Sequence, residues 1–308
     1  MTIELNRLLF DACESVRGEL ATGKVASYIP ALARIDANKF GAAIVTVDGA
    51  TATFGDARET FSIQSISKVF ALTQALNRIG DGLWQRVQHE PSGNAFNSIV
   101  QLELERGIPR NPFINAGALV VSDVLLQGQS PQSCVAALMD FLHLVADDGS
   151  IAIDEEVAQS ELDTAHRNAS LASFMKSFNN LEHEVSDVLQ VYCRHCAIAM
   201  SCEQIARSLL FLANQGVDPL TGARIVSEQR ARRINSIMML CGHYDASGSF
   251  AFRVGLPGKS GVGGGIVVVV PGVATIAVWS PRLNASGNSH TGAAALEAIA
   301  RASGWNIL

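Results

Sequence analysis

A serine and a lysine stand three positions apart at Ser65 and Lys68, in the run Ser-Ile-Ser-Lys. The residues before them suggest an extended segment and those after them a helix, so one helical turn would bring the two side chains together. A hydroxyl at a helix start lies at the positive end of the helix dipole, and a desolvated, neutral lysine amine can take its proton. The pair therefore predicts a serine nucleophile that is activated without histidine.

The same four-residue pattern occurs a second time, at Ser173 and Lys176. A pattern this short also arises by chance, so its structural context has to support it. The second match lies inside a stretch of helical periodicity rather than at a junction between a strand and a helix. We therefore interpret it as structural.

A glycine-rich triplet late in the chain supports the first match. Lys259-Ser260-Gly261 is followed by Val262 and three glycines, directly before a predicted strand. Penicillin-recognising serine enzymes carry a Lys-Thr-Gly or Lys-Ser-Gly triplet at such a place. The chain has only five lysines, and two of them lie in these two motifs. Glycines along a strand edge let a substrate approach the backbone, where an N–H group can help to form an oxyanion hole.

Two nucleotide-binding interpretations of the glycine cluster fail. A phosphate-binding loop ending at Lys259 and Ser260 would require glycine at position 253, where this chain has Arg253. A dinucleotide-binding fingerprint opens a helix, whereas these glycines lead into a valine-rich strand. We expect no nucleotide site.

Hydrophobic periodicity and turn residues predict the elements that position these motifs. Helices are expected at about 3–20, from Ser65 to Gly80, over most of the chain to about 240, and at 292–302. Strands are expected at 42–47 and 51–54 around Asp48-Gly49, and at 250–254, 265–270 and 273–279. Strands at both chain ends predict an α+β fold, in which a mostly antiparallel sheet flanked by helices adjoins a central all-helical lobe. We expect one domain with two lobes, 1–64 plus 245–308 and 65–244, and a ligand site between them.

Composition excludes several classes of function. Hydrophobic residues make up 48% of the 308 residues and charged residues 17%, which argues for a dense core. The net charge of −6 and the lack of a basic run argue against nucleic acid or a membrane as partner, and favour a small-molecule substrate. The N-terminus lacks the features of an export signal, and the apolar run at 266–270 is far shorter than the roughly 20 residues of a transmembrane helix. We expect a cytoplasmic protein.

Neither metal nor organic cofactor is expected. The seven histidines show no zinc-binding spacing, and the six cysteines no disulfide framework. Cys193 and Cys196 form a lone Cys-x-x-Cys in a helical neighbourhood, which we interpret as part of the core.

Several longer motifs accompany these signals. They are Tyr28-Ile-Pro-Ala-Leu-Ala, Phe61-Ser-Ile-Gln-Ser-Ile-Ser-Lys, Glu90-Pro-Ser-Gly, Asn111-Pro-Phe-Ile-Asn-Ala-Gly-Ala, Gln159-Ser-Glu, Arg167-Asn168, Tyr244-Asp and Gly255-Leu-Pro-Gly-Lys-Ser-Gly-Val-Gly-Gly. Together they resemble the serine-dependent glutaminase family over nearly the whole chain. That family shares the fold of β-lactamases and penicillin-binding proteins. The Asn111 and Gly255 motifs are the most specific.

The resemblance implies a role for each matching residue. Ser65 would be the nucleophile and Lys68 its activator, the backbone N–H groups of Ser65 and Val262 would form the oxyanion hole, and Tyr244 would shuttle a proton. Glutamine would be held by Asn115, Glu161, Asn168, Tyr192 and Tyr244, with Tyr28 nearby. These types suit a free amino acid, because a carboxylate such as Glu161 pairs with the substrate ammonium and neutral donors bind the rest. The resemblance further implies hydrolysis of the L-glutamine side-chain amide to glutamate and ammonia, and a homo-oligomer, commonly a tetramer.

Two alternatives stay open at this point. A β-lactamase, penicillin-binding protein or esterase could use the same serine and lysine, because one fold hosts several chemistries. The absence of an export signal and the set Asn115, Glu161 and Asn168 argue against it. A catalytically silent amino-acid-binding relative is the other alternative, which the intact Ser65, Lys68 and Lys259 argue against.

Overall fold

The elements below come from a computed structural model that describes residues 2–93 and 97–308. Its strands are β1 (Gly41–Thr46), β2 (Thr51–Gly55), β3 (Phe61–Ser62), β4 (Ala152–Ile153), β5 (Ile198–Met200), β6 (Gly258–Ser260), β7 (Gly265–Val270) and β8 (Ala274–Trp279). Its α-helices are α1 (Thr2–Ser15), α2 (Ser67–Ile79), α3 (Val100–Leu104), α4 (Asn115–Leu126), α5 (Pro131–Ala146), α6 (Glu155–Asp163), α7 (His166–Ser177), α8 (Val185–Cys196), α9 (Cys202–Ser208), α10 (Leu210–Ala213), α11 (Glu228–Cys241), α12 (Ser247–Val254) and α13 (His290–Ser303). Two 3-10 turns, η3 (Gln64–Ile66) and η5 (Tyr244–Ala246), matter for the site.

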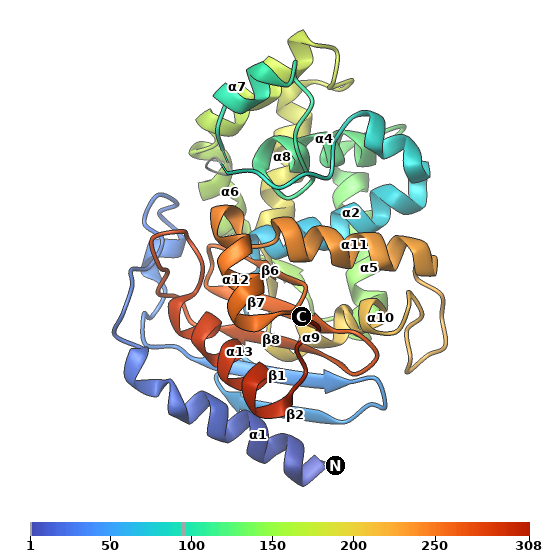
Figure 1. Cartoon of the computed structure of the whole chain (residues 1–308). Helices are drawn as coiled ribbons and strands as arrows, with labels where there is room; N and C mark the ends of the chain where they lie inside the picture. Colours follow the sequence, from blue (N-terminus) through green and yellow to red (C-terminus); the bar gives the residue numbers. More distant parts are fainter. Residues whose placement is uncertain (1, 94–96) are drawn as a thin grey trace.

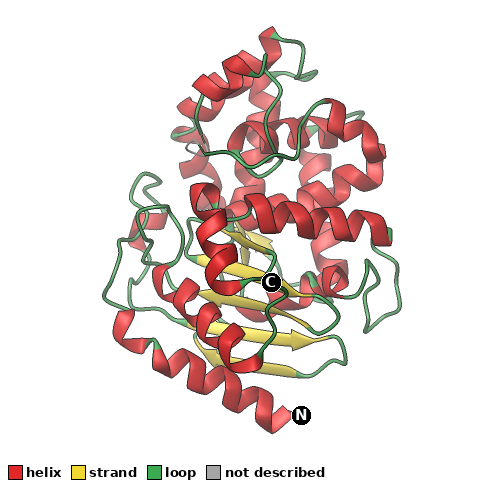
Figure 2. Ribbon diagram, viewed as in Figure 1, coloured by secondary structure: helices red, strands yellow, loops and turns green. Residues whose placement is uncertain are grey.

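The main sheet combines both ends of the chain. Its strand order is β2-β1-β8-β7-β6, and every neighbouring pair is antiparallel. Helices α1 and α13 lie along one face, whereas α9 and α10 cover the other. Figure 2 shows this sheet in the lower part of the view, with helices filling the upper part.

Both faces of the central strands are buried, which explains their unbroken apolar sequences. Every residue of β7 and β8 is buried. In β7, Val267 and Val269 join the large core that extends into the helical part, whereas Ile266 and Val268 join the core beneath α1 and α13. Successive side chains of a strand point to opposite faces, so one run of valines serves two cores.

A second, smaller sheet links the main sheet to the helices. Its order is β3-β5-β4, with Phe61 opposite Met200. The Ser62 hydroxyl donates to the carbonyl of Cys196 at 2.9 Å, so the segment that leads to Ser65 is tied to the end of α8. Helices α2, α4 and α8 then pack on one another above it.

One predicted strand is wrong. Residues 250–254 belong to helix α12, although Phe250, Phe252 and Val254 alternate along the sequence as in a strand. Phe250 and Val254 are buried and Phe252 is 93% exposed. Positions four apart share a helix face, and Gly255 in the left-handed conformation ends the helix, so the pattern has the helical period.

The other helices and strands that the sequence predicts at stated positions are confirmed, as α1, the β1–β2 hairpin, α2, β7, β8 and α13. The structure adds β6, which carries Lys259 and Ser260. Within the described residues no helix is long and apolar enough to cross a membrane. The division at residues 65 and 245 stays a prediction, and α9 and α10 of the middle segment pack on the main sheet.

Candidate active site

A cavity of about 220 Å³ brings together eight of the nine predicted site residues. They are Tyr28, Ser65, Asn115, Glu161, Asn168, Tyr192, Tyr244 and Val262. The ninth, Lys68, is 3% exposed and lies one helical turn beyond Ser65. The site is therefore assembled from seven separate stretches of chain.

Ser65 occupies the 3-10 turn η3, which runs directly into α2. The turn is closed by a hydrogen bond from the Ile66 N–H to the carbonyl of Ile63 at 3.0 Å. Gln64, the residue before the serine, has a φ of +51°, in the left-handed region that few non-glycine residues adopt. Such a sharp turn presents the Ser65 hydroxyl to the cavity although the residue is only 7% exposed.

The glycine loop after β6 packs directly against this turn. A Cβ at Gly261 would lie 2.5 Å from the carbonyl oxygen of Ile63, and one at Gly263 would collide with the carbonyl of Ser62. Only glycine fits at both positions, which explains the Lys-Ser-Gly-Val-Gly-Gly sequence. The close approach brings the Val262 backbone beside Ser65 at the same cavity.

Lys68 is buried behind the serine with its amine held by two acceptors. Nζ donates to the carbonyl of Phe113 at 3.1 Å and to Oδ1 of Asn115 at 2.9 Å. Burial lowers the pKa of Lys68 to about 8, although the charges of Cys196 and Glu161 oppose the shift. A neutral amine has two N–H donors, and with both engaged its lone pair is left to accept a proton.

The start of α4 places Asn115, and Asn111 builds that start. The Asn111 side chain accepts hydrogen bonds from the N–H groups of Phe113 and Ile114, both at 3.0 Å. A Cβ at Gly117 would collide with the Asn111 carbonyl, so glycine is required there. Asn115 then spans the site, because its amide also donates to Oδ1 of Asn168 at 3.0 Å.

Glu161 supplies a buried carboxylate from α6. It is 7% exposed, and its Oε1 has no hydrogen-bond partner among the described residues. Burial raises the pKa of Glu161 to about 7, while a hydrogen bond with Gln64 and the charge of Lys68 oppose that shift. A buried acceptor without a partner is costly, so this oxygen is suited to receive a ligand donor.

Tyr244 contacts the serine from the opposite side, in η5. Its φ of +57° is again in the left-handed region. Its hydroxyl donates to the Ser260 carbonyl at 3.4 Å and interacts with Ser65, and burial raises its pKa to about 12. The phenol is therefore protonated at neutral pH. Lys259 lies beneath the ring, with Nζ 4.7 Å from the ring centroid and bonded to the carbonyl of Gly242 at 3.0 Å.

Two more tyrosines differ in their position. Tyr192 is 5% exposed, its ring centroid lies 5.7 Å from the Lys68 amine, and burial raises the pKa of its phenol. Tyr28 is 56% exposed and forms the rim of the cavity. The buried Tyr192 thus forms part of the inner wall of the cavity, whereas Tyr28 borders its entrance.

The second Ser-x-x-Lys match lies elsewhere, as expected. Ser173 is exposed on α7, and Lys176 donates to the His183 carbonyl and to the Glu184 carboxylate, both at 2.8 Å. Cys193 and Cys196 are buried free thiols of the core. Among the residues that the structure describes, no group of three or more His, Cys, Asp or Glu side chains is placed to hold a metal.

Sequence reasoning missed several polar residues of the cavity, namely Gln64, Asn97, Thr164 and Arg167. Arg167 donates from Nε to the carbonyl of Asn97 at 3.1 Å, which puts a guanidinium at the rim. Gln64 and Arg167 each stand directly before a predicted site residue in the sequence, and this adjacency is the feature that could have placed them at the cavity. The positive φ of Gln64 has no signature in the sequence.

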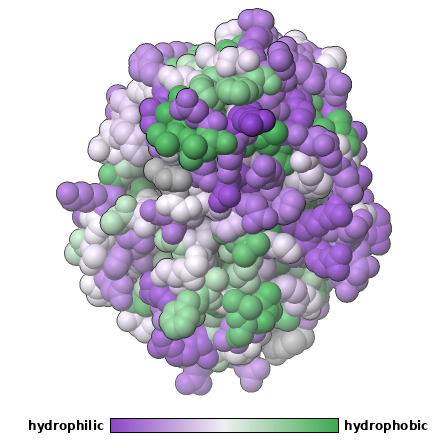
Figure 3. Space-filling model, turned by 45° about the horizontal axis from the view of Figure 1, so that its top comes forward, coloured by the Kyte–Doolittle hydropathy of each residue, from purple (hydrophilic) through white to green (hydrophobic). Residues whose placement is uncertain are grey.

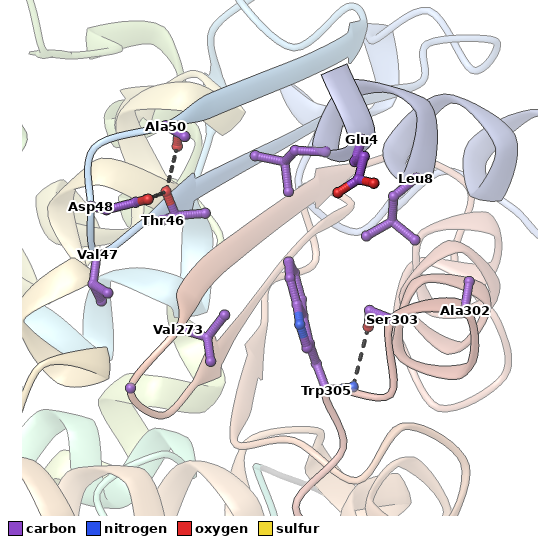
Figure 4. A pocket seen from close by; sticks show the side chains of 12 residues that line it. Glu4, Leu8, Thr46, Val47, Asp48, Ala50, Val273, Ala302, Ser303 and Trp305 are labelled. Carbon is purple, nitrogen blue, oxygen red and sulfur yellow. Dashed lines mark hydrogen bonds between the residues drawn. The ribbon is translucent and has the colours of Figure 1, made fainter. Parts of the chain in front are cut away.

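Larger cavities lie away from these residues. One of about 510 Å³ lies between α1, the β1–β2 turn and the end of α13 (Figure 4). Its lining is mostly apolar, and Figure 4 shows that Thr46 is bonded to Asp48 and to the carbonyl of Ala50. The smaller cavity is lined by Ser65 and by the buried carboxylate of Glu161, whose pKa is raised by burial, and such a perturbed group marks a candidate functional site.

Comparison with known proteins identifies the family. The glutaminase family model matches residues 23–308. A thermolabile glutaminase of Rhizobium etli is 60% identical over 288 residues, which cover 94% of this chain and 93% of that protein.

Solved structures agree with the family match. A probable glutaminase of Bacillus subtilis has a TM-score of 0.92 at 35% identity, covering 100% of this chain and 99% of that one. A B. subtilis glutaminase in covalent complex with 5-oxo-L-norleucine, formed by reaction with 6-diazo-5-oxo-L-norleucine, has a TM-score of 0.89 at 34% identity, covering 98% and 99%. The predicted α+β fold of β-lactamase-like type is thereby confirmed.

Proposed function

Because the chain belongs to the glutaminase family, we propose that it hydrolyses the side-chain amide of L-glutamine through a glutamyl ester on Ser65. One observation carries the proposal. The Ser65 hydroxyl and the Glu161 carboxylate face a single small cavity, with the Lys68 amine directly behind them. Its volume of about 220 Å³ is below the roughly 300–1,000 Å³ of sites for drug-sized ligands, and suits one amino acid.

In the first step the neutral Lys68 amine takes the proton of Ser65 as the hydroxyl oxygen attacks the side-chain carbonyl carbon. The backbone N–H groups of Ser65 and Val262 receive the developing oxyanion, and the glycine loop keeps them side by side. Tyr244, which is protonated at neutral pH, donates to the leaving nitrogen and is reprotonated from Lys68. The C–N bond breaks and ammonia leaves.

In the second step water replaces ammonia. The amine of Lys68 accepts a proton from this water, the water oxygen attacks the ester carbonyl, and the C–O bond to Ser65 breaks. Glutamate is released and the serine recovers its proton. Each proton that leaves a nucleophile therefore returns to a leaving group through residues of the cavity.

Recognition of the substrate follows from charge. The orphaned oxygen of Glu161 receives the substrate ammonium, while Asn168 and Tyr28 offer neutral donors to the carboxylate. Arg167 adds positive charge at the rim on the same side as Asn168. This arrangement favours a free amino acid over a peptide or a lactam.

The activity is expected to rise with pH through two ionisations. Catalysis needs Lys68 neutral and Glu161 charged, and their pKa values are about 8 and about 7. Both groups must lose a proton, so log kcat/KM should climb with a slope of about two below the lower pKa and flatten above the higher one. Steady-state kinetics across this range measure the slope. A flat profile would contradict the assignment.

Replacing Glu161 with glutamine should raise KM. The change keeps the shape of the side chain but removes the charge that pairs with the substrate ammonium, which is worth about 1.5–3 kcal/mol, or roughly 10- to 100-fold. Glu155→Gln, on the exposed side of the same helix, is the matched control and should leave KM unchanged. Equal effects of the two substitutions would show that Glu161 does not bind the ammonium.

We also propose that the protein forms a homotetramer and that it acts in the cytoplasm. Exposed apolar side chains support association, with Phe252 at 93% and Leu104 at 80% exposure. Figure 3 shows hydrophobic patches among hydrophilic residues on one face. Light scattering after size exclusion should give a mass four times the 32.7 kDa of the chain. The mass of a single chain would contradict it.

The test of the function is ammonia release by the purified protein. Release from L-glutamine, with little from L-asparagine and no opening of the β-lactam nitrocefin, is expected. Opening of nitrocefin without turnover of glutamine would favour the β-lactamase alternative. Activity on neither, with binding of glutamate in a thermal-shift titration, would indicate a silent amino-acid-binding protein.

A further inference from the structure

Lys259 is a fully buried lysine that stands behind the active site. The residue is 0% exposed, and it is not among the described residues that line the cavity. Its Nζ donates to the carbonyl of Gly242 at 3.0 Å and to that of Ser260 at 2.5 Å. Burial and the charge of Lys68 lower the pKa of Lys259, but an amine keeps at least two N–H donors in either protonation state, so both bonds persist. Lysine is rarely buried in full unless it is paired, so these two bonds account for its position.

The two carbonyls that Lys259 bonds belong to the two segments that hold Tyr244. Gly242 precedes the tyrosine by two residues in the chain, and the Ser260 carbonyl accepts the tyrosine hydroxyl at 3.4 Å. The amine itself lies 4.7 Å from the centroid of the tyrosine ring. One side chain therefore links the backbone that carries Tyr244 to the strand that receives its hydroxyl, and it also packs on the ring.

Asn288 provides a second link between the same two segments. It is 3% exposed and lies in the loop between β8 and α13. Its Oδ1 accepts from the Ser260 hydroxyl at 2.5 Å, and its Nδ2 donates to the carbonyl of His243 at 3.3 Å. His243 directly precedes Tyr244, and a Cβ at Gly287 would lie 3.7 Å from the tyrosine ring. The loop thus fastens the tyrosine backbone to β6 and packs on the ring.

Tyr244 needs such support because its backbone conformation is unfavourable. Its φ of +57° is left-handed, and for a non-glycine residue this persists only where the surrounding structure holds it. The hydroxyl's bond to the Ser260 carbonyl is long at 3.4 Å, whereas Lys259 bonds the same oxygen at 2.5 Å. Because the lysine satisfies this carbonyl, the hydroxyl can leave it for Ser65 or for a substrate atom.

We propose that Lys259 and Asn288 form a clamp that holds Tyr244 in the position from which its hydroxyl donates a proton to the leaving nitrogen. Both are positioning residues, because neither is among the described residues that line the cavity and both act through Tyr244. The clamp stands on the hydrogen bonds described above. Its effect on turnover rests on the proposed function, in which Tyr244 is the proton donor.

A double-mutant cycle tests whether the clamp acts through Tyr244. Lys259→Met removes both amine bonds and keeps the apolar stem, and kcat for glutamine should fall roughly tenfold to a hundredfold, since a proton donor misplaced by about 1 Å loses that much. Asn288→Ala removes the second link, and kcat should fall about fivefold. In the Tyr244→Phe background each substitution should change kcat by less than about twofold, because the hydroxyl that it positions is gone. Lys176→Met, whose amine bonds Glu184, is the matched control and should behave as the wild type.

Crystal structures test the clamp without any activity. Wild-type crystals should show the bonds of Lys259 and Asn288 to the two segments. Lys259→Met crystals should show the Tyr244 hydroxyl moved by about 1 Å or more, or its ring in two orientations. Circular dichroism shows whether each variant folds, and if Lys259→Met does not, Asn288→Ala provides the same comparison.

An unmoved Tyr244 in the crystals of the folded variants would overturn the proposal. So would a loss of kcat that is equally large in the Tyr244→Phe background, because Lys259 would then act by another route, such as the Phe113 ring, whose centroid lies 5.7 Å from the amine. If the wild-type protein released no ammonia from glutamine, the proposed function would fail, while the crystal structures would still decide the clamp.

Discussion

Replacing Ser65 with alanine is expected to lower kcat for glutamine by at least about a thousandfold. The hydroxyl is the atom that forms the ester, and without it Lys68 has no nucleophile to activate. Ammonia release measured beside circular dichroism separates this loss from misfolding. Because one buried hydroxyl is removed from a turn held by backbone hydrogen bonds, the fold should be retained.

The chain contains its own control for this substitution. Ser173→Ala alters the same pattern on α7, where the serine is exposed. Its kcat should equal that of the wild type. Substantial turnover by Ser65→Ala, or an equal loss in Ser173→Ala, would contradict the assignment.

The second large effect concerns Lys68. Replacing it with methionine removes the general base but keeps the apolar stem, and kcat should fall by roughly a hundredfold to ten-thousandfold. The melting temperature should change little, because the relief from no longer burying an amine offsets the loss of the donor to the Phe113 carbonyl and to Asn115 Oδ1. Saturating glutamine isolates kcat, and thermal unfolding measures the stability.

Lys176→Met is the matched control, since its amine bonds to His183 and Glu184 on the surface rather than in the site. It should keep full activity. If Lys68→Met retained more than a tenth of wild-type kcat, another group would have to be the base, and Tyr244, which interacts with Ser65, would be the first to examine.

The sequence was most informative where local structure determines the chemistry. The junction at Ser65 and Lys68 depends on one helical turn, and the Lys259 triplet on the strand beside it, so spacing together with the neighbouring predicted elements pointed to both motifs. Residues 265–270 are buried on both faces of the sheet, and an unbroken run of valines is typical of such a strand. In contrast, residues 250–254 alternate like a strand and fold as a helix, because burial of Phe250 and Val254 against α13 decides their conformation.

The rest of the site depends on distant segments that meet only in the folded chain. Glu161 and Asn168 follow Ser65 by about a hundred residues, and no period in the sequence relates them to it. Family resemblance pointed to them, whereas spacing could not. Gln64 and Tyr244 have left-handed backbone conformations, next to the glycine loop and in η5. The types of these two residues do not predict such conformations.

Labelling with 6-diazo-5-oxo-L-norleucine tests the central claim, that Ser65 is the nucleophile, most directly. The reagent carbon that bears the diazo group takes a proton, and the nucleophile then attacks this carbon and displaces N₂. Intact-mass spectrometry should show one adduct per chain, equal to the reagent less N₂, and peptide mapping should place it on Ser65. Ser65→Ala should remain unlabelled and Ser173→Ala should label fully. An adduct on another residue, or labelling that persists in Ser65→Ala, would contradict the account.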